Sequence, residues 1–249
     1  AVRLENLPES SRWYPGAGLY RNVHVIVTEN AHIPVWGTYV TTPTATKEFA
    51  KVNVRTQIVL LEGADAGKYS VKTSVWNPNG QKLTEQTIPL SQIKYNDNSL
   101  SQEFIIQTPT LWSPDMPALY SAETRLYEGD QLKDIYTTPF GIRSIEIIPN
   151  KGFFLNGEKT VFKGVCNHHD LGPLGAAVND AAIRRQIRIL KDMGCNAIRT
   201  SHNMPAPELV RACDEMGMML MVESFDEWNK AKCANGYNLI FDEWVEKDL

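Results

Sequence analysis

Three short clusters of polar residues carry most of the chemically useful side chains in this sequence. The clusters span residues 167–170 (Asn-His-His-Asp), 200–203 (Thr-Ser-His-Asn) and 223–228 (Glu-Ser-Phe-Asp-Glu-Trp). Together they contain three of the five histidines of the chain. Imidazoles, carboxylates and amides offer both donors and acceptors to a polar ligand. Because each cluster directly follows a short apolar run, we expect all three to lie at the ends of strands.

An arginine and a glutamate are the most informative pair in these segments. Arg199 lies within an apolar run, and a buried guanidinium is costly without a carboxylate partner. Arginine is also the natural clamp for a carboxylate, which it keeps ionised. Glu223 ends the next apolar run, so we place both residues in the site rather than treating Arg199 as the partner of a structural acid. Asp226 and Glu227 are interpreted as solvated loop charges.

The histidines can be separated by their neighbours in the chain. Successive residues in an extended segment point in opposite directions. At most one of His168 and His169 is therefore expected to face the site, and we choose His168. His202 stands between Ser201 and Asn203 at a strand end, which favours a ligand-facing donor over a purely structural histidine.

Two further candidates have plain structural alternatives that remain open. Asp170 suits the capping of a turn about as well as it suits a ligand contact. Trp228 offers a flat apolar surface on which a sugar ring could stack, but ordinary packing of a tryptophan is equally compatible with its position.

No metal or cofactor is expected. Barrel metallohydrolases often carry His-x-His on a strand, whereas the two histidines here are contiguous, so a metal-dependent hydrolase ranks third among the alternatives. The sequence has neither a GxGxxG nor a GxxxxGK[ST] motif, so nucleotide binding has no support. The cysteines form no CxxC pair and are interpreted as free thiols; they are Cys166, Cys195, Cys213 and Cys233.

The segments that must position these residues fall into two parts with different hydrophobic periods. Between residues 38 and 142, apolar and polar residues alternate, as in 52–60, 69–75 and 120–126. Alternation with turn residues roughly every ten positions predicts an antiparallel sandwich of immunoglobulin type. No cysteine lies in this stretch, so the sandwich is expected to lack an inter-sheet disulfide.

After residue 143 the pattern predicts alternating strands and helices. Apolar runs at 161–165, 196–200 and 218–222 are expected to be strands, the last one apolar on both faces as parallel strands are. Asn179 is the predicted cap of the first helix and Pro207 the first residue of the second. Three βα units are either a small open sheet or the beginning of a barrel of eight, which needs about 250 residues.

In parallel sheets, ligands bind at the carboxyl ends of the strands, and this is where all three polar clusters are expected. The net charge of −4 argues against a nucleic-acid partner. No apolar run approaches the roughly 18 residues of a membrane helix. The first residues do not resemble a signal peptide, which would lie upstream if the chain is a piece of a longer one, so the compartment stays unknown.

Five motifs resemble those of one enzyme family. Residues 164–170 (Gly-Val-Cys-Asn-His-His-Asp) resemble the G-x-N-x-H-E-D motif of glycoside hydrolase family 2, and residues 195–203 its N-A-[IVF]-R-x-S-H-[YN] motif. Residues 12–21 (Arg-Trp-Tyr-Pro-Gly-Ala-Gly-Leu-Tyr-Arg) are similar to the strand that closes its sugar-binding jelly roll. Residues 111–120 resemble the late part of its immunoglobulin-like domain, and 140–143 the link to its barrel.

The resemblance implies a multi-domain fold, with an antiparallel, immunoglobulin-like β-sandwich followed by the first three βα units of a (β/α)8 barrel. Residues 1–37 would be the C-terminal strands of the jelly roll, 38–142 the sandwich and 143–249 the first part of the catalytic barrel. The incomplete barrel would leave an open strand edge, which favours self-association.

The resemblance also implies a retaining exo-β-glycosidase, most similar to β-galactosidases, that takes a β-galactoside or related oligosaccharide. Both catalytic glutamates are expected beyond Leu249, so this chain alone should be inactive and contain no catalytic residue. The substrate-binding residues would be Asp170, His168, Arg199, His202, Asn203, Glu223 and Trp228, with Arg199 orienting the nucleophile.

Two departures from the family pattern affect the expected sugar specificity. Asn203 stands where many relatives have tyrosine, and His169 where many have glutamate. The alternatives are a β-glucuronidase or β-mannosidase of the same family, or a non-catalytic carbohydrate-binding module in which the sandwich binds the sugar. The natural substrate, its linkage and the oligomeric state are not predicted by the sequence.

Overall fold

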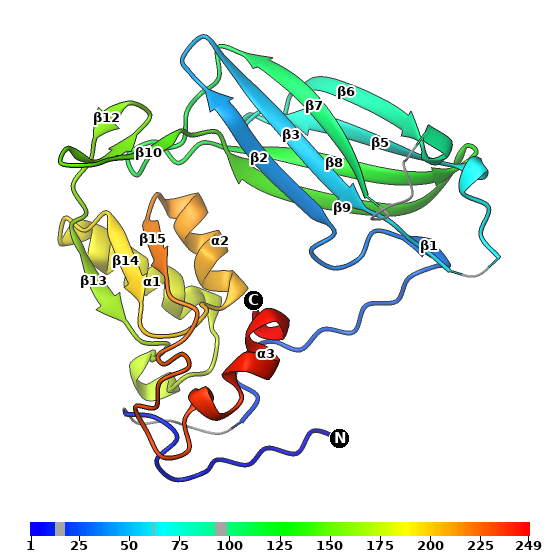
Figure 1. The fold of residues 1–249 in the computed structure, drawn as a ribbon. Coiled ribbons are helices and arrows are strands. Elements are labelled where there is room, and N and C mark those ends of the chain that lie inside the picture. Colours follow the sequence, from blue (N-terminus) through cyan, green and yellow to red (C-terminus); the bar gives the residue numbers. More distant parts are fainter. Residues whose placement is uncertain (13–17, 62, 93–98) are drawn as a thin grey trace. The chain divides into compact units, whose positions relative to one another are not determined.

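The computed structural model describes residues 1–12, 18–61, 63–92 and 99–249. Its contacts divide the chain into two compact units, one of residues 25–161 and one that joins residues 1–24 to residues 162–249. The first unit is built from strands, and the second from strands and helices (Figure 1).

Among the described residues of the all-β unit, two antiparallel sheets form the sandwich that the alternating sequence pattern predicts. One sheet has three strands in the order β2-β3-β7, and the other has four in the order β6-β5-β8-β9. The strands are β2 (Thr38–Ala45), β3 (Phe49–Gln57), β5 (Tyr69–Trp76), β6 (Lys82–Pro89), β7 (Ser99–Gln107), β8 (Leu119–Glu128) and β9 (Gln131–Gly141). A short pair, β1 (Ala31–His32) with β4 (Val59–Leu60), extends this unit.

The core of the sandwich confirms the predicted period of two. Along β3, every second side chain is buried, and Val52 and Val54 have no exposed surface. A buried polar group lies among these apolar side chains, where Thr73 Oγ1 donates to Gln102 Oε1 at 2.6 Å. The turn between β5 and β6 is organised by Asn77, whose Oδ1 accepts from the backbone N–H groups of Asn79 and Gln81.

A small three-stranded sheet follows the sandwich in the chain. It consists of β10 (Ile145–Ile148), β11 (Gly152–Leu155) and β12 (Glu158–Lys159). Asn156 and Gly157 form the turn between β11 and β12 with φ angles of 53° and 79°, which is the hairpin chemistry that their sequence indicates.

The assignment of residues 1–37 to a jelly roll stays a prediction. Of the described residues in this range, only those of β1 form a strand, and residues 13–17 of the quoted motif lie outside the described residues. The predicted boundaries at 37 and 142 likewise stay predictions, because the two compact units divide the chain after residues 24 and 161 instead.

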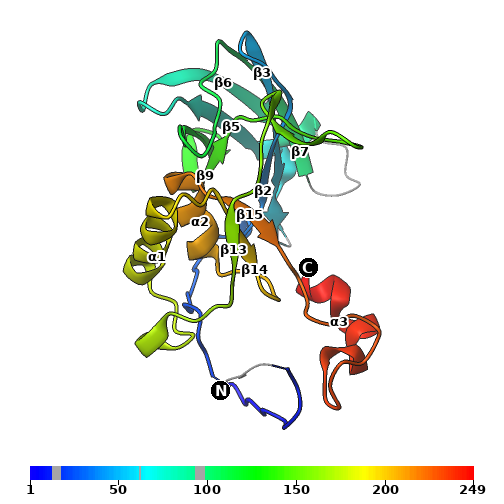
Figure 2. The same cartoon turned by 90° about the vertical axis from the view of Figure 1, so that its left-hand side faces the viewer.

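The second unit contains the predicted parallel βα array. The strands β13 (Gly164–Asn167), β14 (Ala197–Thr200) and β15 (Met219–Val222) are parallel and adjacent in that order. The helices α1 (Asp180–Asp192) and α2 (Pro207–Met216) cover one face of the sheet (Figure 2). A third helix, α3 (Phe241–Asp248), follows a long loop after β15.

Local sequence signals account for both covering helices. The Asn179 side chain accepts from the backbone N–H of Ala182 and caps α1, and Pro207 is the first residue of α2. Gly217 ends α2 in the left-handed region with φ of 74°. The predicted apolar stripe of α1 is buried against β14 and α2; it consists of Ile183, Ile187 and Leu190.

Two of the strand predictions need correction. The first strand begins at Gly164, and the preceding Val161 and Phe162 are exposed rather than part of it. The last strand was expected to be buried on both faces, but Met221 and Val222 are 53% and 46% exposed. The reason is that β15 is an outer strand of its sheet, so its final residues lack the neighbours that bury a central strand.

Candidate functional site

The ends of β14 and β15 are joined by a cluster of Arg199, His202 and Glu223. The guanidinium of Arg199 donates from Nε to Oε1 of Glu223 and forms an ion pair with the same oxygen through Nη2. The other oxygen, Oε2, lies 2.7 Å from Nδ1 of His202. Two side chains thus hold the carboxylate, and the backbone N–H of Glu223 is fixed separately, because it donates to Oγ1 of Thr200 at 3.1 Å.

The same arginine reaches the first strand. Its Nη1 donates to the thiol sulfur of Cys166 on β13 at 3.3 Å, so one side chain connects all three parallel strands. The Arg199 side chain is 40% exposed, which corrects the expectation of a buried guanidinium. With this exposure, the value of the ion pair lies in positioning the carboxylate rather than in large stabilisation.

The environment of Glu223 keeps its carboxylate ionised. Partial burial alone would raise the pKa, but the hydrogen bonds from His202 and Arg199 outweigh it, and the pKa of Glu223 is lowered from its ordinary value of 4.5. The hydrogen bond to Cys166, followed by that to Glu223, raises the pKa of Arg199 above its ordinary value. Arg199 and Glu223 are therefore both charged around neutral pH.

An open cleft of about 990 Å³ surrounds this cluster. Its lining includes Arg199, His202, Glu223 and Trp228, together with other residues of the loop after β15. The volume lies at the upper end of the range for pockets that bind small molecules. The indole of Trp228 is 66% exposed, so its ring is accessible to a ligand. Phe225, which also lines the cleft, stacks on Tyr237 with ring centroids 4.8 Å apart.

The two adjacent histidines face different neighbours, as expected for an extended segment. The ring of His168 meets that of His202 edge-on, with centroids 5.3 Å apart. His168, the histidine predicted to face the site, therefore contacts the cluster of Arg199, His202 and Glu223 through His202. The ring of His169 stacks on Tyr20 at 5.2 Å and forms a side-chain hydrogen bond with Asn203.

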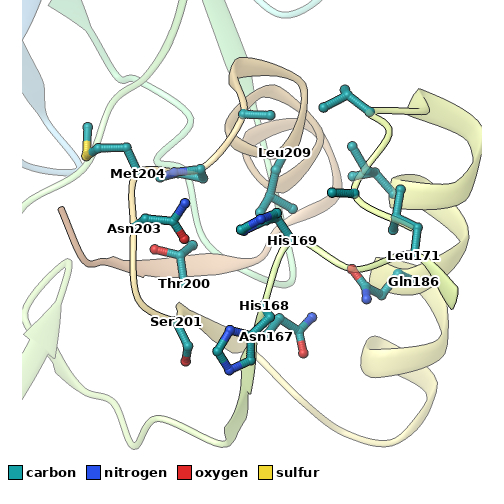
Figure 3. Close-up of a pocket in the computed structure, with 15 residues that line it drawn as sticks. Asn167, His168, His169, Leu171, Gln186, Thr200, Ser201, Asn203, Met204 and Leu209 are labelled. Atoms are coloured by element: carbon teal, nitrogen blue, oxygen red, sulfur yellow. The ribbon is translucent and has the colours of Figure 1, made fainter. Parts of the chain in front are cut away.

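A second, smaller cavity lies between the loops that follow β13 and β14 and the helices α1 and α2 (Figure 3). Both His168 and His169 line it, as does Asn203, so the expectation that only one histidine faces a pocket does not hold for this cavity. Its volume of about 50 Å³ accommodates a few water molecules but not a sugar ring. Asn203 is absent from the lining of the larger cleft, and its predicted sugar contact stays a prediction.

Asp170 caps a turn, which is one of the two roles that the sequence left open for it. Its Oδ1 accepts from the backbone N–H of Gly172 at 2.8 Å. Asp170 lines neither the larger cleft nor the smaller cavity. Its predicted contact with a sugar is therefore not supported by the geometry of the described residues and stays a prediction.

The loop after β15 corrects the interpretation of Asp226 and Glu227 as solvated charges. Glu227 is 4% exposed, and its carboxylate accepts backbone N–H groups of Lys232 at 2.7 Å and Asn238 at 3.1 Å. Asp226 is paired with Arg12 at 2.8 Å and has a side chain only 13% exposed. Both carboxylates line the cleft. Arg12 is far from Asp226 in the chain, and the donors to Glu227 lie in the same irregular loop, so no periodic pattern indicated this role.

Among the described residues, no three or more His, Cys, Asp or Glu side chains are grouped so that they could hold a metal ion. In the same part of the chain, no helix is both long and apolar enough to cross a membrane. All four cysteines are free thiols; Cys213 is buried and Cys166 is exposed.

The described residues thus form an antiparallel sandwich followed in the chain by three parallel strands with their helices, with charged groups gathered at the carboxyl ends of these strands. Comparison with known proteins identifies the family. Residues 31–143 match "Glycosyl hydrolases family 2", and residues 146–243 match "Glycosyl hydrolases family 2, TIM barrel domain". The chain belongs to glycoside hydrolase family 2.

Related proteins include enzymes named for two different sugars. The chain is 44% identical over its whole length to β-galactosidase BoGH2A of Bacteroides ovatus and 36% identical to a putative β-glucuronidase of Formosa agariphila. A crystal structure of a family 2 member from Bacteroides cellulosilyticus covers 96% of the chain with a TM-score of 0.89 and 36% identity. The chain spans 29%, 23% and 31% of these three proteins, respectively.

Proposed function

We propose that this chain supplies the sugar-holding part of a retaining exo-β-glycosidase that hydrolyses terminal β-galactosides. The observation that carries the proposal is the Arg199–His202–Glu223 cluster at the strand ends, within a cleft of about 990 Å³. The 44% identity to a β-galactosidase supports galactose as the sugar.

In this proposal, each residue of the cleft has a defined task. Glu223 stays ionised and accepts a hydroxyl hydrogen of the sugar, while Arg199 keeps the carboxylate in position. Trp228 provides an apolar surface for a face of the sugar ring. His202 donates or accepts at the edge of the cleft, and His168 supports its ring.

The chemical step needs two carboxyl groups about 5 Å apart. In a retaining enzyme, one attacks the anomeric carbon and the other protonates the leaving oxygen, then takes a proton from the water that releases the sugar. We assign neither task to a residue of this chain, because Glu223 is engaged with Arg199 and His202. The pair is proposed to belong to the rest of the protein.

A β-glucuronidase is the second candidate. Relatives with this name match the chain, including one over its full length, and two lysines, Lys230 and Lys232, line the cleft. A lysine near the sugar would attract the carboxylate that distinguishes a glucuronide from a galactoside.

A panel of aryl β-glycosides tests the proposal on the full-length gene product. Hydrolysis of the β-galactoside with retained anomeric configuration is the expected result, with slower turnover of the β-glucuronide and β-mannoside. Preferential turnover of the glucuronide would select the second candidate. Absence of turnover on all three would indicate a carbohydrate-binding module.

The 249-residue chain alone provides a separate test of where the chemistry lies. Purified chain should release no product from an aryl β-galactoside. Turnover that disappears in a Glu223→Gln variant would show that the chain holds its own catalytic carboxylate and that our assignment is wrong.

A further inference from the structure

A short N-terminal segment, residues 20–22, contacts both polar loops of the βα unit. The backbone carbonyl of Tyr20 accepts the N–H of Val178 at 2.9 Å, and its ring stacks on that of His169. Both partners belong to the connection between β13 and α1. Tyr20 thus contacts the loop that carries His168.

The next two residues of the segment contact the other loop. Arg21 donates from Nη2 to the backbone carbonyl of Met204, and its guanidinium lies 5.3 Å from the centroid of the Tyr20 ring. The side-chain amide of Asn22 donates to Oε1 of Glu208 at 2.6 Å. Met204 and Glu208 belong to the connection between β14 and α2 and to the first turn of α2, so the segment joins the two loops.

Part of the boundary between these two loops is not packed. The small cavity of about 50 Å³ lies between them, and a cavity forfeits the packing contacts that would otherwise fix its walls. Direct contacts remain beside the cavity: the backbone N–H of Ser201 donates to the carbonyl of Asn167 at 2.9 Å, and the side chains of His169 and Asn203 are hydrogen-bonded. Figure 3 shows His169 and Asn203 approaching each other. Beyond the cavity, the rings of His168 and His202 meet edge-on, and His202 in turn contacts Glu223.

We propose that residues 20–22 act as a strap that positions the two loops, with Tyr20 and Arg21 as positioning residues for His168 and His202. The effect of this strap on sugar binding rests on the proposed function, whereas its contacts with the two loops do not. The strap touches neither Glu223 nor Trp228, and it acts only through the loops that it joins.

Matched variants separate the strap from general stability. Tyr20→Ala removes the ring that stacks on His169, whereas Tyr20→Phe keeps this ring and removes only the hydroxyl. Arg21→Ala removes the donor to Met204, and Arg21→Lys retains a cation that can still reach the carbonyl. Arg3→Ala is the control for arginine removal, since Arg3 is exposed and pairs only weakly with Glu5 at 3.7 Å.

The first readout is the contact between the rings of His168 and His202, measured on this chain by NMR cross-relaxation well below the melting temperature. Loss of the contact in Tyr20→Ala and Arg21→Ala is expected, with retention in Tyr20→Phe, Arg21→Lys and Arg3→Ala. An unchanged contact in both alanine variants would overturn the proposal, whatever happens to thermal stability.

The titration of His169 gives a second, independent readout. Desolvation of its ring lowers its pKa, and the nearby charge of Arg21 lowers it further, although the residue keeps part of its surface open to water. The pKa should rise toward 6.5 in Tyr20→Ala and stay low in Tyr20→Phe. An unshifted titration in Tyr20→Ala would show that the stacking contact is absent and contradict the strap.

Affinity for a non-hydrolysable thiogalactoside links the strap to function. A roughly tenfold weaker dissociation constant is expected in Tyr20→Ala and Arg21→Ala, about the effect of one lost contact. Affinity equal to wild type despite a lost His168–His202 contact would overturn the positioning role. Absence of binding by the wild-type chain would count against the proposed function alone, because the ring contact and the titration still decide the strap.

Discussion

At the scale of single residues, the site depends on one guanidinium held between a thiol and a carboxylate. Arg199 connects Cys166, Glu223 and, through Glu223, His202. The need of Arg199 for a carboxylate partner was predicted from an expected buried position; the partner is present, although the arginine is partly exposed. The thiol contact was not predictable, because the register that brings Cys166 opposite Arg199 appears only in the folded sheet.

The ionised state of Glu223 should appear in the pH dependence of stability. Its pKa is lower in the folded chain than the ordinary value of 4.5. The ionised carboxylate therefore stabilises the fold above about pH 4.5, and this contribution is lost as the pH falls through the lowered pKa. Urea unfolding between pH 3 and 7 should show a shallower acid-side loss of stability in Glu223→Gln than in wild type. If the free energy of unfolding depended on pH in the same way in both proteins, Arg199 and His202 would not keep Glu223 ionised as described.

The cysteines should differ strongly in reactivity. Burial raises the pKa of the Cys213 thiol to about 12, so almost no thiolate is present at neutral pH. Cys166 is exposed and accepts a hydrogen bond from Arg199. Iodoacetamide at pH 7.5 should modify Cys166 and leave Cys213 unmodified in the folded chain, as measured by peptide mass spectrometry. Denatured chain, in which both should react, is the control.

At the scale of elements, helices were easier to predict than loops. The caps and periodic stripes of α1 and α2 are local signals, and both helices form where Asn179 and Pro207 indicate. The loop after β15 was misjudged because it has no periodic pattern and its contacts form only when the loop folds back on itself. Glu227 is buried by backbone donors from positions 232 and 238, and no short-range pattern reports such contacts.

The buried Glu227 gives a sharp test of this loop. A Cβ atom at Gly236 would lie 1.6 Å from Oε1 of Glu227, so Gly236→Ala must displace the carboxylate. Glu227→Ala leaves two backbone donors without their partner, at about 1–3 kcal/mol each. Urea unfolding should show both single variants to be destabilised, with the exposed Glu246→Ala as the neutral control.

A double variant shows whether the two residues act on each other. Gly236→Ala should cost less in the Glu227→Ala background than in wild type, because the side chain it displaces is gone. Strictly additive losses would mean that the glycine is needed for a reason other than the close approach of Glu227.

At the scale of the whole molecule, the sequence predicted the fold class well. The change of hydrophobic period from two to a helical repeat separated the sandwich from the βα units, and both are present. The family is confirmed by matches to both parts. The extent of each strand was less predictable, because burial at an outer strand such as β15 depends on neighbours rather than on its own residues.

The outer strand suggests a behaviour of the isolated chain. Among the described strands, β15 pairs only with β14, and Met221 and Val222 are exposed beside it. Unpaired strand edges with apolar residues favour association between chains. Light scattering should therefore detect an increase in average mass with concentration, which a Met221→Lys variant should suppress. A strictly monomeric wild-type chain at high concentration would contradict this expectation.

The most direct test of the account is a chemical-shift map of the 249-residue chain titrated with a phenyl β-thiogalactoside. We predict that the largest changes occur at Arg199, His202 and residues 223–228, which line the cleft of the βα unit. Changes confined to the sandwich between residues 38 and 142 would contradict the account, since they would show that the sugar is held by the β-sheets and not at the ends of the parallel strands.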